Sequence, residues 1–304
     1  MPKESADRLR ILYLCVCALC AVGICVGTMF DFDISMALMS DSGIGAAIAD
    51  YGLSLVDLFY AFAGTCLFVG LRKKGERYEL LGRVALGIGM SMPFIFYAND
   101  VGWNVRAMMG YVGGESSPLL AFASLVPSAI VVTAIPLVFA RRLEDKDPDR
   151  LIATGVFLIA CGICSQYAND LLKPLFSRPR PRYLATLDDP AAEFRAWWQL
   201  APYTDGPSDA VGSCPSNHMM LATLMLNLPI IVSAVRHRSE APDRASITIA
   251  CAYVAVMAYN RIQMGGHFLS DVCLGVLLTT CLLRLFFSAF LGPYVTGGES
   301  RVSE

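Results

Sequence analysis

The sequence predicts an all-α membrane protein: a polytopic helix bundle with about eight transmembrane helices, forming one integral domain over residues 1–304. Three observations lead to this fold class. Of the 304 residues, 55% are hydrophobic and only 16% are charged, whereas soluble domains carry roughly 25% charged residues. The mean hydropathy of +0.53 excludes a disordered chain. The hydrophobic residues also gather in runs close to the roughly 20 residues that a spanning helix needs.

Eight such runs follow one another, at residues 11–30, 52–71, 80–98, 118–140, 151–169, 219–235, 245–260 and 272–290. The first run has no charge and is longer than the apolar core of a signal peptide, which has about 7–15 residues. We therefore expect it to remain as a span. The third run contains Arg83, and the seventh is the shortest of the eight.

The distribution of basic residues predicts the orientation. If the N-terminus is cytoplasmic, Lys and Arg in the cytoplasmic segments outnumber those in the outer segments by about two to one, in agreement with the positive-inside rule. We therefore expect a multi-pass protein of the cell membrane with both termini in the cytoplasm. The balance of 24 Lys and Arg against 26 Asp and Glu argues against a nucleic-acid partner.

Three short segments on the predicted outer side carry polar side chains suited to phosphate chemistry, at residues 173–181, 215–218 and 261–271. Arginine matches pairs of phosphate oxygens with a planar fork, and lysine adds a point charge. Ser216 stands where the predicted sixth helix begins. Its hydroxyl and the free N–H groups of that helix end can donate to an anion.

Two of the three histidines, His218 and His267, fall in these segments, where a ring nitrogen can do acid–base or nucleophilic work near neutral pH. Asp271 lies four residues after His267 and shares a helical face with it. A carboxylate there can orient the imidazole and stabilise its cation. Arg261 lies six residues before His267, so we expect Gly265-Gly266 to end the seventh helix and turn both side chains into one pocket.

These segments resemble the signature of the type 2 phosphatidic acid phosphatase (PAP2) superfamily, which reads K-x6-R-P, then P-S-G-H, then S-R-x5-H-x3-D. The matching positions are Lys173, Arg180, Pro181, Pro215, Ser216, His218, Arg261, His267 and Asp271. Asn217 stands where the family has Gly, and Asn260 where it has Ser. Asn is the residue that best replaces Gly at a positive φ, so we expect altered specificity or rate before loss of activity.

The resemblance implies a membrane phosphatase of the lipid-phosphatase branch, which hydrolyses a phosphate monoester or pyrophosphate at the extracytoplasmic face with no metal or cofactor. The implied phosphate-binding residues are Lys173, Arg180, Arg261, Ser216 and Asn217. The implied catalytic residues are His267, His218 and Asp271. His267 would attack phosphorus to form a phosphohistidine, and Asp271 would orient it. His218 would protonate the leaving oxygen and then activate water.

Family members usually have six core helices, so the resemblance implies a core over residues 79–290 with two extra N-terminal helices over residues 1–78. A site at headgroup depth favours a lipid phosphate or pyrophosphate as substrate, such as undecaprenyl pyrophosphate or phosphatidic acid, with membrane lipids around it. Three alternatives stay open: a lipid phosphotransferase with the same site, a non-catalytic binding protein and a transporter. The oligomeric state stays open too.

Two further features lie near the first motif. The first motif could also be aligned with Arg178-Pro179 in place of Arg180-Pro181, but the family spacing favours Arg180. We therefore expect Arg178 to attract anionic headgroups. The loop over residues 182–214 has the length of a lid or a specificity element. Its Trp197-Trp198 pair is typical of interfacial anchors, with the lining of a substrate groove as the alternative.

Overall fold

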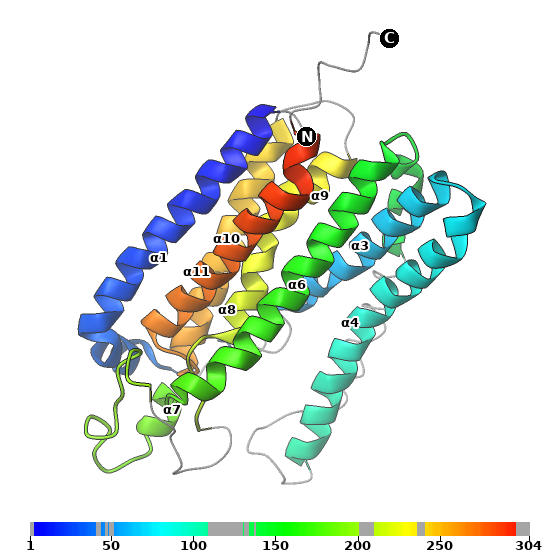
Figure 1. The fold of residues 1–304 in the computed structure, drawn as a ribbon. Helices are drawn as coiled ribbons and strands as arrows, with labels where there is room; N and C mark the ends of the chain where they lie inside the picture. Colours follow the sequence, from blue (N-terminus) through cyan, green and yellow to red (C-terminus); the bar gives the residue numbers. More distant parts are fainter. Residues whose placement is uncertain are drawn as a thin grey trace. The chain divides into compact units, whose positions relative to one another are not determined.

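The computed structural model describes residues 3–40, 44–45, 48, 52–108, 130, 134–136, 138–200, 210–235 and 241–295. The helices are α1 (Lys3–Leu38), α3 (Ser54–Lys73), α4 (Glu79–Met108), α6 (Pro148–Phe176), α7 (Pro181–Leu184), α8 (Asn217–Ala222), α9 (Leu228–Val235), α10 (Ala241–Gln263) and α11 (Leu269–Phe286) (Figure 1). Shorter helical turns are η1 (Glu76–Tyr78), η2 (Thr223–Asn227), η3 (Phe287–Leu291) and η4 (Gly292–Tyr294). The described chain contains no strand, which confirms the all-α prediction.

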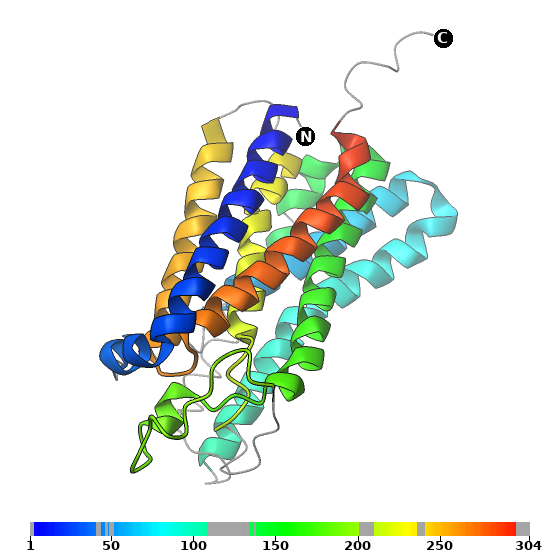
Figure 2. The same ribbon diagram turned by 60° about the vertical axis from the view of Figure 1, so that its left-hand side comes forward.

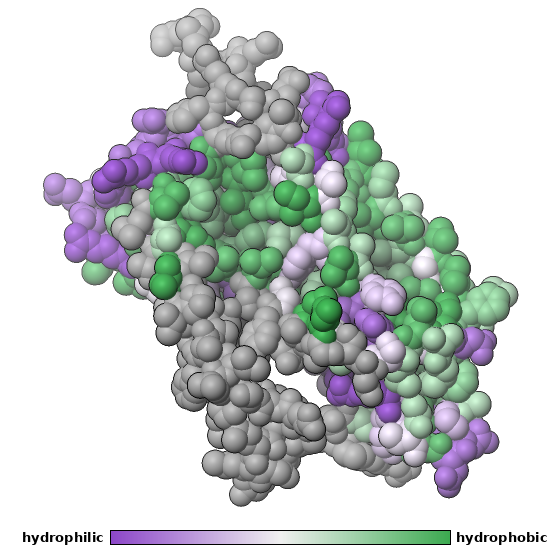
Figure 3. Space-filling model, turned by 180° about the vertical axis from the view of Figure 1, so that it is seen from behind, coloured by the Kyte–Doolittle hydropathy of each residue, from purple (hydrophilic) through white to green (hydrophobic). Residues whose placement is uncertain are grey.

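Six segments of the described chain are long and apolar enough to cross a membrane, at residues 3–38, 55–73, 148–176, 217–235, 244–263 and 269–294. They coincide with six of the eight predicted spans, so the chain is a polytopic membrane protein. The third predicted span, 80–98, falls in α4, which is not one of the six. The fourth, 118–140, lies mostly outside the described residues. On the face seen in Figure 3, hydrophobic residues cover most of the described surface, and hydrophilic residues form smaller separate groups.

Contacts divide the chain into two compact units. One contains residues 54–159 and 231–239. In this unit α3 and α4 form a close hairpin, because glycines bring the two backbones together. A Cβ at Gly64 would lie 2.8 Å from the carbonyl oxygen of Ala85, and one at Gly89 would lie 2.5 Å from that of Tyr60.

The other unit contains residues 1–53, 160–230 and 240–304. In it, α1 lies against α11 over much of their length (Figure 2). Small residues permit this approach: a Cβ at Gly23 would lie 2.4 Å from the Cys273 sulfur, and one at Gly27 would lie 2.9 Å from the backbone nitrogen of Ser270. The predicted six-helix core over residues 79–290 stays a prediction, and in the structure α1 packs with the helices that carry the motifs.

A hydrophobic cluster joins the helices of this unit, with α8, η2, α10 and α11 in mutual contact. Its buried members are Cys20, Met219, Ala222, Met257, Ile262, Val272 and Val276. The cluster includes residues from α1, α8, α10 and α11. It therefore holds in register the helix ends from which the polar side chains of the motifs project.

Candidate active site

The end of α6 positions the first motif. Lys173 lies in the last turn of α6 and is half-buried. Ser177 follows the helix with a φ of 38°, which stops it. The chain then runs extended to Arg180, which precedes α7. The Nη1 of Arg180 lies 3.4 Å from the carbonyl oxygen of Gly266, so the first motif contacts the third.

The second motif lies at the start of α8. Ser216 caps this helix, since its Oγ accepts a hydrogen bond from the backbone N–H of Met219 over 3.4 Å. The hydroxyl proton therefore stays available to an acceptor outside the helix. The backbone N–H of Ser216 donates to the carbonyl oxygen of Asp271 over 3.2 Å. Asn217 and His218 form the first turn of α8 and are half-buried.

A turn after α10 brings the ends of the third motif together. Gly265 has a φ of 60°, and the carbonyl of Arg261 accepts hydrogen bonds from the N–H groups of Gly266 and His267, each over 3.2 Å. A Cβ at Gly266 would lie 2.7 Å from Nη2 of Arg261, so this glycine leaves room for the guanidinium. The turn is where the sequence predicts it, and it places Arg261 beside His267.

His267 is only 1% exposed. Burial lowers the pKa of its imidazole well below the usual value, because it disfavours the charged ring. The neighbours that lower this pKa further are Arg180, Arg261, Lys173 and His218. The structure therefore gathers both predicted histidines and all three predicted cations around one ring, which is neutral at physiological pH.

A backbone carbonyl fixes the tautomer of this ring. The Nδ1 of His267 lies 2.6 Å from the carbonyl oxygen of Ser213. A carbonyl can only accept a hydrogen bond, so Nδ1 carries the proton and Nε2 carries the lone pair. A neutral imidazole with a lone pair at Nε2, surrounded by cations, is suited to attack an anionic phosphorus centre.

The carboxylate of Asp271 has other partners. Its Oδ1 accepts from Nη1 of Arg178 over 2.7 Å, and its Oδ2 accepts from the backbone N–H of Phe268 over 2.9 Å. The sequence predicted that this carboxylate would orient the ring of His267. Among the described residues, Ser213 is the partner of the His267 Nδ1, while Arg178 and the N–H of Phe268 occupy the two oxygens of Asp271.

A family model described as the PAP2 superfamily matches residues 151–292. This part of the chain belongs to the PAP2 superfamily. The matched range contains all three motifs and does not contain α1. PAP2 proteins generally are phosphatases that act on phosphate esters, and at this level the chain is a phosphatase. No curated protein and no solved structure matches the chain significantly.

The PAP2 site includes two charged residues that the sequence analysis did not assign to it. Arg178 is only 1% exposed, so the prediction that it attracts headgroups is wrong. Asp31, 2% exposed, lies at the far end of α1 from the N-terminus, and its Oδ2 lies 3.0 Å from Nη2 of Arg178. A carboxylate directly after the first apolar run was the signal that could have drawn attention to Asp31.

The two asparagines that depart from the PAP2 signature have different surroundings. The Nδ2 of Asn260 donates to the carbonyl oxygen of Gly45 over 2.8 Å, so this side chain holds the segment that follows α1. Asn217 does not have a positive φ, because Ser177 is the one non-glycine residue with a positive φ in the described chain. Asn217 therefore does not need the conformational freedom of the glycine that it replaces.

The charged groups that the structure describes around His267 in this PAP2 site are cations and not clustered metal ligands. Within the described ranges, no group of three or more His, Cys, Asp or Glu side chains is arranged to hold a metal ion. The positive charges near His267 are those of Lys173, Arg180 and Arg261. These three cationic side chains are suited to bind phosphate oxygens.

Proposed function

We propose that this chain hydrolyses a lipid phosphate monoester or pyrophosphate through a phosphohistidine on His267, without a metal ion. One observation carries the proposal. A buried, neutral imidazole has its Nδ1 held by the carbonyl of Ser213, over 2.6 Å, and lies among three cationic side chains. An uncharged nucleophile inside a cationic cluster is suited to attack on an anionic phosphoryl group.

The first step is the attack of the Nε2 lone pair on phosphorus, which forms an N–P bond. The bond from phosphorus to the leaving oxygen breaks, and His218 protonates that oxygen. In the second step His218 takes a proton from water, which attacks phosphorus and breaks the N–P bond. Inorganic phosphate leaves, and the neutral His267 is restored. General acid–base catalysis of this kind contributes about 10²–10⁴-fold to a rate.

Binding of the phosphoryl oxygens falls to the cations and to the start of α8. Lys173, Arg180 and Arg261 would neutralise the charge that builds on these oxygens in the transition state. The hydroxyl of Ser216 and the backbone N–H of Asn217 would donate to the same oxygens. The Ser216 hydroxyl is suited to this, because its oxygen accepts from the N–H of Met219 and the hydroxyl can still donate its proton.

The depth of the site supports a lipid substrate. Lys173 lies in the last turn of α6 and Arg261 in the last turn of α10, both long apolar helices. Side chains at such ends lie at headgroup level, where a lipid presents its phosphate. Undecaprenyl pyrophosphate and phosphatidic acid both fit this chemistry. The positive-inside distribution of charge supports an extracytoplasmic site with cytoplasmic termini.

The test is phosphate release by the purified protein in detergent, with His267→Ala beside the wild type. The panel contains undecaprenyl pyrophosphate, phosphatidic acid and a soluble phosphate ester. We expect release from a lipid member, loss of that release in His267→Ala, inhibition by vanadate and little effect of EDTA. A phosphorylated lipid product without free phosphate would instead indicate a phosphotransferase. No turnover of any member would contradict the proposal, and strong inhibition by EDTA would contradict its metal-free form.

A separate experiment tests on which side of the membrane the site lies. Asp188 is exposed in the loop between the first two motifs, and Asp145 is exposed just before α6. In intact cells, a membrane-impermeant maleimide should label Asp188→Cys above the wild-type background. It should label Asp145→Cys only after lysis. The opposite pattern would place the site in the cytoplasm.

A further inference from the structure

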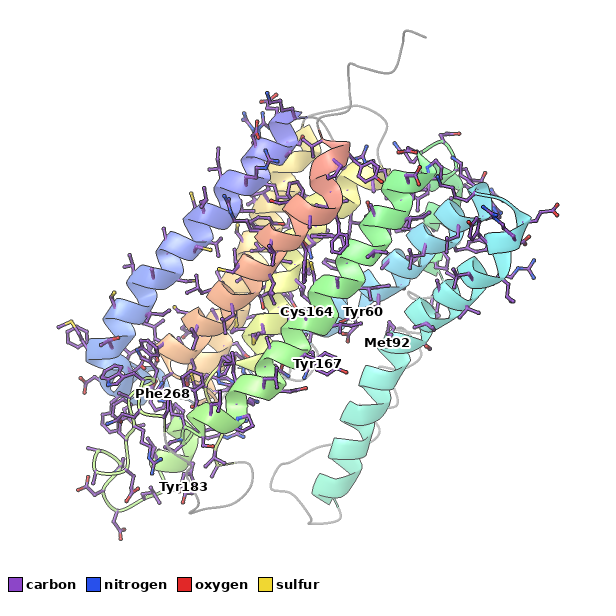
Figure 4. All side chains as sticks on the ribbon, in the orientation of Figure 1. Tyr60, Met92, Cys164, Tyr167, Tyr183 and Phe268 are labelled. Carbon is purple, nitrogen blue, oxygen red and sulfur yellow. The ribbon has the colours of Figure 1, made fainter. Side chains whose placement is uncertain are left out.

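The first helix contributes a buried carboxylate to the site, although it lies outside the PAP2 match. Asp31 of α1, Arg178, and Ser270 and Asp271 of α11 form one hydrogen-bonded group, which we call the carboxylate clamp. Every member is 2% exposed or less. Figure 4 shows the surroundings of the clamp, with Phe268 labelled at the start of α11 and close to the end of α1.

Asp31 binds two parts of the clamp at once. Its Oδ1 accepts from the backbone N–H of Ser270 over 3.0 Å, and its Oδ2 accepts from the Ser270 hydroxyl and from Nη2 of Arg178. Asp31 therefore satisfies a free N–H in the first turn of α11, which a capping residue of that helix normally does. Gly27 permits this contact, because a Cβ there would lie 2.6 Å from Oδ1 of Asp31.

Arg178 is held from all sides. Its Nη1 bonds both Asp271 and the Ser270 hydroxyl, and its Nε donates to the carbonyl oxygen of Arg195 over 2.6 Å. The guanidinium carbon lies 3.9 Å from the ring centroid of Phe268 and 5.3 Å from that of Phe194. Burial alone would lower the pKa of Arg178, but Asp271 and Asp31 more than offset this and raise it. One cation thus neutralises two carboxylates that would otherwise repel each other.

The clamp leads directly to the reacting groups. Asp271 accepts from the N–H of Phe268, the residue after His267, and its own carbonyl accepts from the N–H of Ser216. A shift of Asp271 would therefore move both the nucleophile and the start of α8. Arg178 limits such a shift, because its Nη1 bonds Asp271. Asp31 in turn holds Arg178 through Nη2.

We infer that Asp31 is a positioning residue: through Arg178 and Asp271 it holds His267 and Ser216 in their reactive geometry, which makes α1 part of the active site. The inference rests on the proposed function, and it extends the site beyond the PAP2 motifs to a helix that their signature does not include. Since Asp31 touches none of the groups that would bind phosphate, its removal should act on the rate of the reaction and not on substrate affinity.

The test compares Asp31→Asn with Asp33→Asn, which changes an exposed carboxylate two residues further along the same helix. We expect Asp31→Asn to lower kcat about 10- to 100-fold, the range for lost support of a reacting group, with KM nearly unchanged. Asp33→Asn should behave as the wild type. Gly27→Ala should reproduce the loss of kcat, because its Cβ displaces Asp31 without changing any charge.

A double variant distinguishes a positioning role of Asp31 from a general effect on the stability of the protein. Arg178→Gln leaves two buried carboxylates without a cation. Adding Asp31→Asn removes one of them, so the double variant should be more active than Arg178→Gln alone. Wild-type kcat in Asp31→Asn would overturn the inference. So would a double variant that is less active than Arg178→Gln, or a fall in kcat fully explained by the fraction of unfolded protein.

Vanadate binding keeps this test separate from that of the proposed function. If the wild type hydrolyses no member of the panel, the proposed function fails. The inference then depends on stabilisation of the protein by vanadate against heat. Vanadate mimics the pentacoordinate phosphorus of the transition state and not the bound substrate, so Asp31→Asn should raise its apparent Kd at least tenfold, while Asp33→Asn should leave it unchanged. Equal vanadate affinity in Asp31→Asn and wild type overturns the inference alone, and a wild type that neither turns over nor binds vanadate overturns both.

Discussion

The imidazole of His267 and the carbonyl of Ser213 are joined by a hydrogen bond of 2.6 Å, which fixes Nε2 as the ring atom that carries the lone pair. Ser213 belongs to the segment just before the second motif, so this bond also ties that segment to the third motif. The carboxylate that was expected to orient the ring, that of Asp271, instead binds Arg178 and the N–H of Phe268. The predictions below depend on this division of roles.

Asp271→Asn should lower activity and stability together. The substitution removes a charge that Arg178 faces in a buried site, and breaking a buried ion pair costs about 3–5 kcal/mol. Thermal unfolding in detergent, measured beside kcat, checks this, with Asp33→Asn as control. In a triad whose carboxylate orients the histidine directly, this substitution lowers kcat about 10⁴-fold. A loss of that size with an unchanged thermal midpoint would contradict the role that we assign to Asp271.

The dependence of kcat/KM on pH should be bell-shaped, with its acid limb below pH 6.5. Burial and the neighbouring cations lower the pKa of His267, so the ring stays neutral as the pH falls below the usual pKa, about 6.5. Lys173→Met removes one of these cations and should raise the pKa, moving the acid limb toward higher pH. Rate profiles of both proteins on one substrate measure the shift, and a limb that moves to lower pH would refute the sign.

Gly266→Ala should reduce kcat/KM at least about tenfold, since small displacements at a reacting site have effects of this size or larger. The added Cβ would lie 2.7 Å from Nη2 of Arg261 and would push the guanidinium out of the site. Gly87→Ala is the matched control, because a Cβ there meets nothing within 4 Å. Equal kinetics in the two variants would mean that Arg261 does not bind the substrate in the position seen.

Asn217→Ala should keep kcat/KM within about tenfold of the wild type, a difference of roughly 1.4 kcal/mol. We expect the backbone N–H of Asn217 to bind phosphate, and this group survives the change. Ser216→Ala should lose more, because it removes both a phosphate donor and the helix cap, and the cap is worth about 1 kcal/mol of stability. Steady-state rates of the two variants decide the order, and a greater loss in Asn217→Ala would assign binding to its side chain.

The sequence alone was sufficient for the fold class, and it named most of the side chains that lie near His267. Apolar runs near 20 residues predict spanning helices, because a bilayer leaves the backbone few other ways to satisfy its hydrogen bonds. Six of the runs are spans in the described chain. The turn at Gly265-Gly266 was predictable from glycine, which alone adopts a φ of 60° at no steric cost. Local chemistry of this kind is determined by residues that are neighbours in the chain.

Only the tertiary structure decided which groups support His267. Asp31 and Arg178 are 147 residues apart, and nothing in their local sequence says that both are buried against each other. The carbonyl of Ser213 has no signature, because every residue has a carbonyl. Both partnerships arise from packing: Gly27 lets α1 approach α11, and Arg178 and the N–H of Phe268 then engage the two oxygens of Asp271. Sequence spacing thus determined which residues gather at the site, and long-range packing decided what each of them holds.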